Sequence, residues 1–60
     1  MTPDSLLAWR NRLGLNQTGA ALSLGTSRNY YMAMEAGRSK IPRYIALACA
    51  AIALGVPPHP

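Results

Sequence analysis

A chain of 60 residues forms one domain at most, and a domain this small buries only about 60% of the surface that its unfolded chain exposes. Six Lys and Arg residues against two Asp and Glu residues give a net charge of +4, which favours an anionic partner: nucleic acid first, an acidic membrane surface second. With one cysteine, Cys49, and one histidine, His59, the composition excludes an internal disulfide framework and a four-ligand metal site.

The first predicted helix begins after Thr2 and ends at Gly14. Thr2 suits the N-cap, Pro3 the first helical position, and Asp4 the first turn, where a carboxylate faces the positive end of the helix dipole. Glycine is typical of the residue that follows a helix. One face of this helix carries four residues at helical spacing, which are Leu6, Trp9, Arg10 and Leu13.

The second and third predicted helices are short, and Gly25 separates them. Asn16 can cap a helix over residues 17–24, and Ser27 can cap one over residues 28–36. Two helices that cross steeply need a small side chain at their contact and a residue that accepts positive φ in the turn, and Ala21 and Gly25 meet those needs. The pattern predicts a helix-turn-helix, which places its second helix in the major groove of DNA.

The fourth predicted helix opens at Pro42 and runs to Leu54. It is apolar all round, so both of its faces should be buried. One face consists of Ile45, Ala48, Cys49 and Ile52, and the nearly opposite face consists of Leu47, Ala50, Ala51 and Leu54. We expect the first face to pack on the other helices and the second to contact a second copy of the chain. The alternative is an Ala-rich helix that stays half exposed.

Several motifs resemble those of the lambdoid phage repressor and Cro family, and more broadly of the Xre-type helix-turn-helix regulators. They are RLGLNQ (residues 12–17), Ala21, Gly25, EAG (residues 35–37) and IPRY (residues 41–44). PRYIALACAAIALGVPP is also similar to small regulators of phage and proteobacterial genomes, including some anti-CRISPR-associated repressors.

This resemblance implies an all-α fold, a compact helix-turn-helix domain of four helices. Family members often carry a fifth helix for dimer contacts, whereas this sequence continues in prolines. The family usually has Ile or Val at the position of Tyr31. We expect one domain over residues 1–56 and a flexible proline-rich tail over residues 57–60.

Arg10 and Glu35 are predicted to form a structural ion pair. Arg10 shares its helix face with Leu6 and Leu13, so it points at the core and needs a partner. The family resemblance pairs the positions of Arg10 and Glu35 in a partly buried ion pair that fixes the first helix against the third. Two separate surface charges are the alternative.

The outer face of the third helix is the predicted DNA-reading surface. Helical spacing turns Tyr31 and Met34 inward and leaves Arg28, Asn29, Met32, Ala33 and Ala36 on the opposite face. In a major groove, Arg28 can bond to guanine and Asn29 to adenine, while Met32 and Ala33 can pack on thymine methyl groups. The resemblance implies that the positions of Arg28, Asn29 and Ala33 read bases. A phosphate contact is the alternative for Arg28.

Predicted phosphate contacts flank this surface. Asn16 and Gln17 start the second helix and Ser27 precedes the third, so free backbone N–H groups at both sites can hold a phosphate. Arg38, Lys40 and Arg43 cluster after the third helix, where the family contacts the DNA backbone, although a solvated loop is the alternative. Tyr30 fits either a phosphate contact or a cover over the core, and Arg12 is left unassigned.

We therefore expect a cytoplasmic transcriptional regulator, a repressor that binds a palindromic operator in double-stranded DNA as a homodimer. No catalytic set, cofactor site or small-molecule site is evident, so we expect a protein that is not an enzyme. The alternative function is a protein-interaction module, such as an antitoxin or an adaptor. A membrane-surface peptide is disfavoured because the last helix lacks a Lys-rich polar face.

Overall fold

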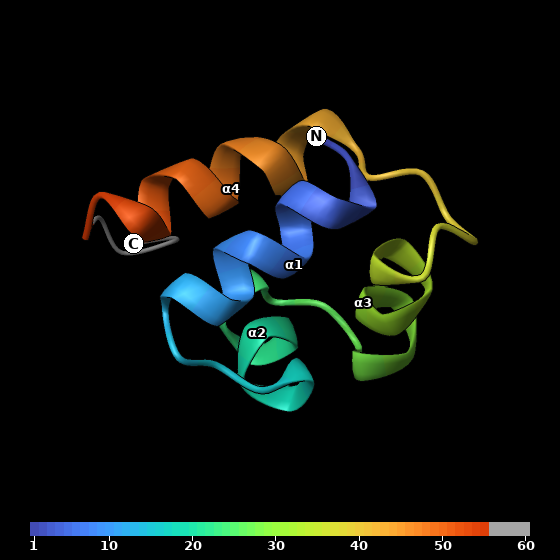
Figure 1. The fold of residues 1–60 in the computed structure, drawn as a ribbon, viewed down its shortest axis with the longest axis horizontal. Helices are drawn as coiled ribbons and strands as arrows, with labels where there is room; N and C mark the ends of the chain where they lie inside the picture. Colours follow the sequence, from blue (N-terminus) through green and yellow to red (C-terminus); the bar gives the residue numbers. More distant parts are fainter. Residues whose placement is uncertain (56–60) are drawn as a thin grey trace.

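The computed structural model describes residues 1–55, and within that range the chain forms four α-helices and no strand. They are α1 (Pro3–Arg12), α2 (Gln17–Leu24), α3 (Arg28–Glu35) and α4 (Arg43–Ala53). In Figure 1, α1 runs between α4 and α2, and α3 lies to one side. The all-α prediction is confirmed for this part of the chain, whereas the predicted tail over residues 57–60 lies outside the described residues.

The first three helices begin at the predicted N-caps. The Thr2 hydroxyl oxygen accepts a hydrogen bond from the Ser5 N–H at 3.1 Å, and the Ser5 Oγ accepts one from the Thr2 N–H at 2.9 Å. Asn16 and Ser27 cap α2 and α3 with one bond each, in which the side-chain oxygen accepts a backbone N–H. Local side-chain bonding therefore sets where these helices start.

The turn between α2 and α3 depends on Gly25, which ends α2 with φ of 71°. This left-handed conformation lets the Thr26 N–H reach the Ala21 carbonyl at 3.0 Å, so a carbonyl at the end of α2 is satisfied. Ala21 is buried where the two helices approach, as its small size predicts. Glycine weakens a helix interior, but a larger residue at position 19 would crowd the cap of α2. A Cβ there would lie only 3.2 Å from the Asn16 Oδ1 that caps the helix.

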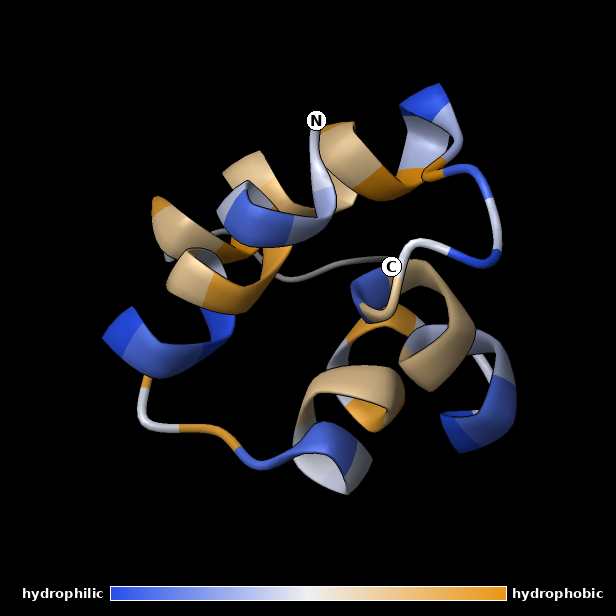
Figure 2. Cartoon of the chain, turned by 45° about the vertical axis from the view of Figure 1, so that its right-hand side comes forward, coloured by the Kyte–Doolittle hydropathy of each residue, from blue (hydrophilic) through white to orange (hydrophobic). Residues whose placement is uncertain are grey.

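The fourth helix begins one residue later than predicted. Pro42 is the N-cap in extended conformation, and α4 starts at Arg43. The proline therefore stands just outside the helix, and no side chain caps this helix start. Hydrophobic residues occupy most of α4 after its first turn, as Figure 2 shows.

Each helix contributes two residues to one buried core, which consists of Leu6, Trp9, Ala20, Ala21, Tyr31, Met34, Ile45 and Cys49. The Trp9 indole N–H donates to the Cys49 carbonyl at 2.9 Å, and this bond joins α1 to α4. Cys49 is buried as predicted, and burial raises the pKa of its thiol to about 11. The core holds α2 and α3 against α1 and α4, and so determines which face of α3 remains outside.

Candidate nucleic-acid interface

The outer face of α3 is accessible, as the helical spacing predicts. Arg28 and Asn29 are exposed in its first turn, and Met32 and Ala33 are half-buried one turn further along. Tyr31 and Met34 point the other way and are fully buried. The Ser27 Oγ accepts the Tyr30 N–H at 3.1 Å, which fixes the backbone that carries Arg28 and Asn29.

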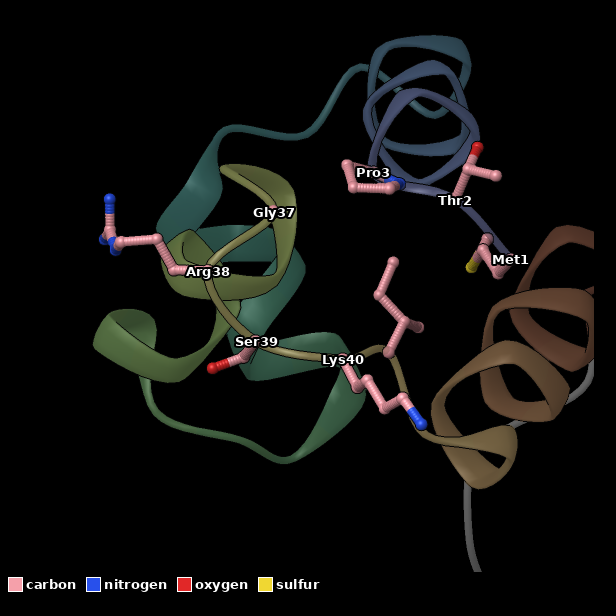
Figure 3. Close-up of a pocket in the computed structure, with 8 residues that line it drawn as sticks. Met1, Thr2, Pro3, Gly37, Arg38, Ser39 and Lys40 are labelled. Carbon is pink, nitrogen blue, oxygen red and sulfur yellow. The ribbon is translucent and has the colours of Figure 1, made fainter.

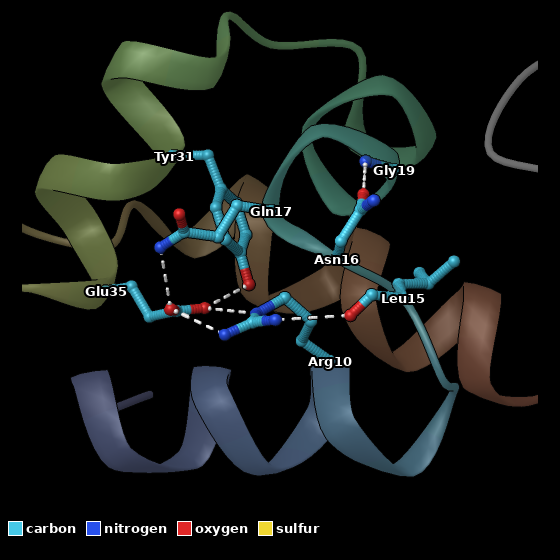
Figure 4. A network of polar contacts seen from close by, with 7 residues as sticks. All are labelled: Arg10, Leu15, Asn16, Gln17, Gly19, Tyr31 and Glu35. Carbon is cyan, nitrogen blue, oxygen red and sulfur yellow. Dashed lines mark hydrogen bonds and ion pairs between the residues drawn. The ribbon is translucent and has the colours of Figure 1, made fainter.

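The ion pair predicted between Arg10 and Glu35 is present. The Arg10 Nε donates to the Glu35 Oε2 at 2.8 Å and the Arg10 Nη2 donates to Oε1 at 3.1 Å, so the guanidinium grips both carboxylate oxygens (Figure 4). Only 17% of the Arg10 side chain and 8% of the Glu35 side chain are exposed. This bidentate pair connects α1 to α3 in a largely desolvated position.

Two further donors reach the same carboxylate. The Tyr31 hydroxyl donates to the Glu35 Oε2 at 2.7 Å, and the Gln17 amide Nε2 donates to Oε1 at 3.1 Å. Tyr31 thus combines a buried ring with a hydroxyl that serves the ion pair, a role that Ile or Val does not offer. The Glu35 cluster, defined as Glu35 with Arg10, Gln17 and Tyr31, joins three helices.

The Glu35 cluster changes the ionisation of its members. Burial raises the pKa of the Glu35 carboxyl, but hydrogen bonds from Arg10, Tyr31 and Gln17 outweigh burial and bring the pKa below its ordinary value of 4.5. Burial and then the bond to Glu35 raise the pKa of the Tyr31 hydroxyl above its ordinary range. Glu35 is therefore ionised at neutral pH.

The Gln17 side chain has an internal contact in addition to its predicted place at a phosphate-binding helix start. Its side chain is half-buried and turned toward Glu35, so one N–H of the amide is already used inside the protein. The Asn16 Oδ1 is used too, because it accepts the Gly19 N–H at 2.7 Å. The groups that remain for a ligand here are the Nδ2 hydrogens of the exposed Asn16, the second N–H of Gln17 and the first backbone N–H groups of α2.

The predicted basic residues after α3 are all exposed: Arg38, Lys40 and Arg43. Residues 37–41 pass close to the start of α1, where they and residues 1–3 line an open cavity of about 430 Å³. In Figure 3 the Arg38 and Ser39 side chains point away from Pro3 and Met1. The Arg38 side chain therefore extends into solvent, although the residue is part of the cavity lining.

Tyr44 is an exposed residue to which the sequence patterns assigned no role. Its side chain is 64% exposed at the start of α4. Tyr30 packs partly against the core, so the structure favours the core-covering alternative for that residue. Burial and then the neighbouring Tyr44 raise the pKa of the Tyr30 hydroxyl. The signal for Tyr44 was its spacing, because Tyr44, Leu47, Ala51 and Leu54 repeat at helical intervals along one face.

The outer face of α4 is uncovered within a single copy of the described chain. Leu47 is 60% exposed and Leu54 is 81% exposed, Ala50 is exposed and Ala51 is half-buried. The opposite face packs inward through Ile45, Cys49 and Ile52, as predicted. The inward packing of the first face is therefore confirmed, whereas contact of the outer face with a second copy stays a prediction.

Among residues 1–55, Arg10–Glu35 is the one ion pair, and Arg12, Arg28, Arg38, Lys40 and Arg43 are exposed without an acidic partner. No group of His, Cys, Asp and Glu in this range has an arrangement that suits a metal ion. Within the same range, every helix is too short or too polar to cross a membrane.

Comparison with known proteins gave no match: neither a family model, nor a curated protein, nor a solved structure is significantly similar to this chain.

Proposed function

We propose that the protein is a sequence-specific DNA-binding regulator, a cytoplasmic repressor in which α2 and α3 act as a helix-turn-helix of the phage repressor and Cro type. The observation that carries this proposal is the outer face of α3. It presents Arg28 and Asn29 side by side in an N-capped first turn, with exposed cations on the segment that follows the helix.

The outer face of α3 supplies the groups that distinguish base pairs in a major groove. A guanidinium donates two hydrogen bonds to guanine O6 and N7, and a carboxamide donates to and accepts from adenine N7 and N6. Arg28 and Asn29 offer these two groups, and both are exposed. Met32 and Ala33 are partly exposed beside them and offer apolar contact to thymine methyl groups.

Phosphates on either side of the groove would be held by different means. Arg38, Lys40 and Arg43 provide positive charge after α3. On the α2 side, the helix N-terminus provides uncharged N–H donors. The net charge of +4 supports attraction to any DNA sequence, and the base contacts then select among sequences.

The proposal includes a homodimer formed through the outer face of α4. Leu47 and Leu54 are exposed apolar side chains that a second copy could bury. Residues 44–55 carry no charged side chain, so two cationic copies can meet at this face without direct repulsion. The exposed side chains offer on the order of 400 Å² per copy, about half of what each partner buries in a standard stable interface. We therefore expect a weak dimer in solution that becomes stable on a palindromic site.

Repression by this dimer would be steric, because a protein bound at a promoter competes with RNA polymerase. A gel shift on random double-stranded DNA at increasing salt tests the underlying claim of DNA binding. We expect binding that weakens steeply with salt, since bound phosphates release counterions. Absence of any salt-sensitive shift would overturn the proposal in favour of the protein-interaction module.

The cations after α3 should act on all DNA sequences alike. Lys40→Ala and Arg43→Ala should each weaken binding uniformly and lower the slope of log affinity against log salt by about one unit. Fluorescence anisotropy on two unrelated duplexes, over a range of salt, measures both quantities. Arg12→Ala is the matched comparison, because it also removes one positive charge but lies at the end of α1 opposite to the end that residues 37–41 approach. A change in sequence preference with an unchanged salt slope would show that Lys40 and Arg43 do not contact phosphates.

A further inference from the structure

The Glu35 cluster does more than join helices, because two of its bonds end at the start of α2. The Gln17 amide donates to the Glu35 Oε1 at 3.1 Å, and the Arg10 Nη1 donates to the Leu15 carbonyl at 3.2 Å. Leu15 and Gln17 flank Asn16, the N-cap of α2. Glu35 and Arg10 together thus hold both sides of this helix start (Figure 4).

Gln17 is the member of the cluster that can also reach a ligand. An amide Nε2 has two hydrogens, and Glu35 uses one of them. The amide oxygen of Gln17 points away from Glu35 in Figure 4, and the second N–H of Nε2 has no hydrogen-bond acceptor among residues 1–55. Because one bond already fixes the rotation of the amide, the remaining N–H has a defined direction and loses little entropy when it binds.

We propose that Glu35 is a positioning residue for DNA-backbone binding, and that it acts by orienting the Gln17 amide so that its second N–H meets a phosphate oxygen. This inference rests on the proposed function. Arg10 neutralises the Glu35 carboxylate, so the negative charge beside the phosphate is compensated. The internal ion pair and the outer DNA contact are then linked through one side chain.

Gln17→Met tests the contact, because methionine keeps the length and helix propensity but has no N–H donor. We expect affinity for all DNA sequences to fall about three- to tenfold, the effect of one hydrogen bond. The salt slope should stay unchanged because Gln17 is neutral, whereas Lys40→Ala lowers it. Anisotropy titrations at several salt concentrations provide both readouts, and circular dichroism verifies the fold.

Glu35→Gln tests the positioning step, with binding measured at a low temperature where circular dichroism shows the variant folded. If Glu35 acts through Gln17, the Gln17→Met change should have no additional effect on affinity in the Glu35→Gln background. Independent effects of the two changes would overturn the inference, as would wild-type affinity in Gln17→Met. A wild type that binds no DNA would instead overturn the proposed function itself.

A measurement on the unmodified protein covers the case in which Glu35→Gln does not fold. Nuclear magnetic resonance resolves the two Nε2 protons of Gln17, and we expect one of them to exchange with water at least tenfold more slowly than the amide protons of exposed Asn11 and Asn29. On addition of DNA, the other proton should shift. Fast exchange of both protons, or no shift of the second with DNA, would contradict the positioning role.

Discussion

Glu35→Ala should remove about half or more of the free energy of unfolding at room temperature. The change leaves the Arg10 guanidinium without its counter-ion and removes the acceptor for the Tyr31 hydroxyl and the Gln17 amide. Removal of one partner from a buried ion pair costs about 3–5 kcal/mol. The total free energy of unfolding of a domain this small is about 3–9 kcal/mol. Urea titration followed by circular dichroism measures the loss.

Two controls separate this effect from a general loss of negative charge. Asp4→Ala removes the only other acidic residue, which is exposed in the first turn of α1, and should cost no more than about 1 kcal/mol. The double variant Arg10→Met, Glu35→Leu replaces the pair with apolar side chains and should recover much of the lost stability. Equal losses for Glu35→Ala and Asp4→Ala would mean that the Glu35 cluster does not hold the helices together.

Leu54→Glu should produce a folded monomer with operator affinity reduced on the order of 100-fold. Leu54 is 81% exposed, so the fold tolerates the change, but a dimer would place two new carboxylates in a small apolar interface. Each buried leucine contributes about 1.5–3 kcal/mol, and two copies lose one each. Sedimentation with and without DNA measures the assembly, and a gel shift measures the affinity.

Leu22→Glu is the matched control for this prediction. Leu22 is 76% exposed on α2, outside the outer face of α4, so the same change there should leave the dimer intact. A wild type that stays monomeric at high concentration and binds DNA as one copy per site would contradict the dimer. An equal loss of assembly in Leu22→Glu and Leu54→Glu would place the interface elsewhere.

Local signals in the sequence predicted the helices well, because they depend on neighbours in the chain. Thr2, Asn16 and Ser27 each bond to a backbone N–H a few residues ahead, so their roles follow from residue type and position. Burial of Tyr31 and Met34 followed from helical spacing. Pro42 was placed one residue too far into its helix because proline suits both the N-cap and the first turn.

Contacts between helices were harder to predict. The pairing of Arg10 with Glu35 came from a family resemblance and not from spacing. Gln17 and Glu35 are far apart in the sequence, and no local pattern indicates that the amide of one meets the carboxylate of the other. The only role predicted for Gln17 was therefore at the start of α2, where backbone N–H groups can hold a DNA phosphate. Tyr44 was left without a role, although its spacing with Leu47 and Leu54 places it on the exposed face of α4.

Selection of bound sites from a pool of random double-stranded DNA tests most directly the central claim, that the outer face of α3 reads DNA. We expect a palindrome with half-sites about 34 Å apart. We also expect that Arg28→Ala and Asn29→Ala each lose preference at one base pair, at a cost of about 1–3 kcal/mol on the best site. Enrichment of no sequence by the wild type, or unchanged sequence preference in both variants, would contradict this claim.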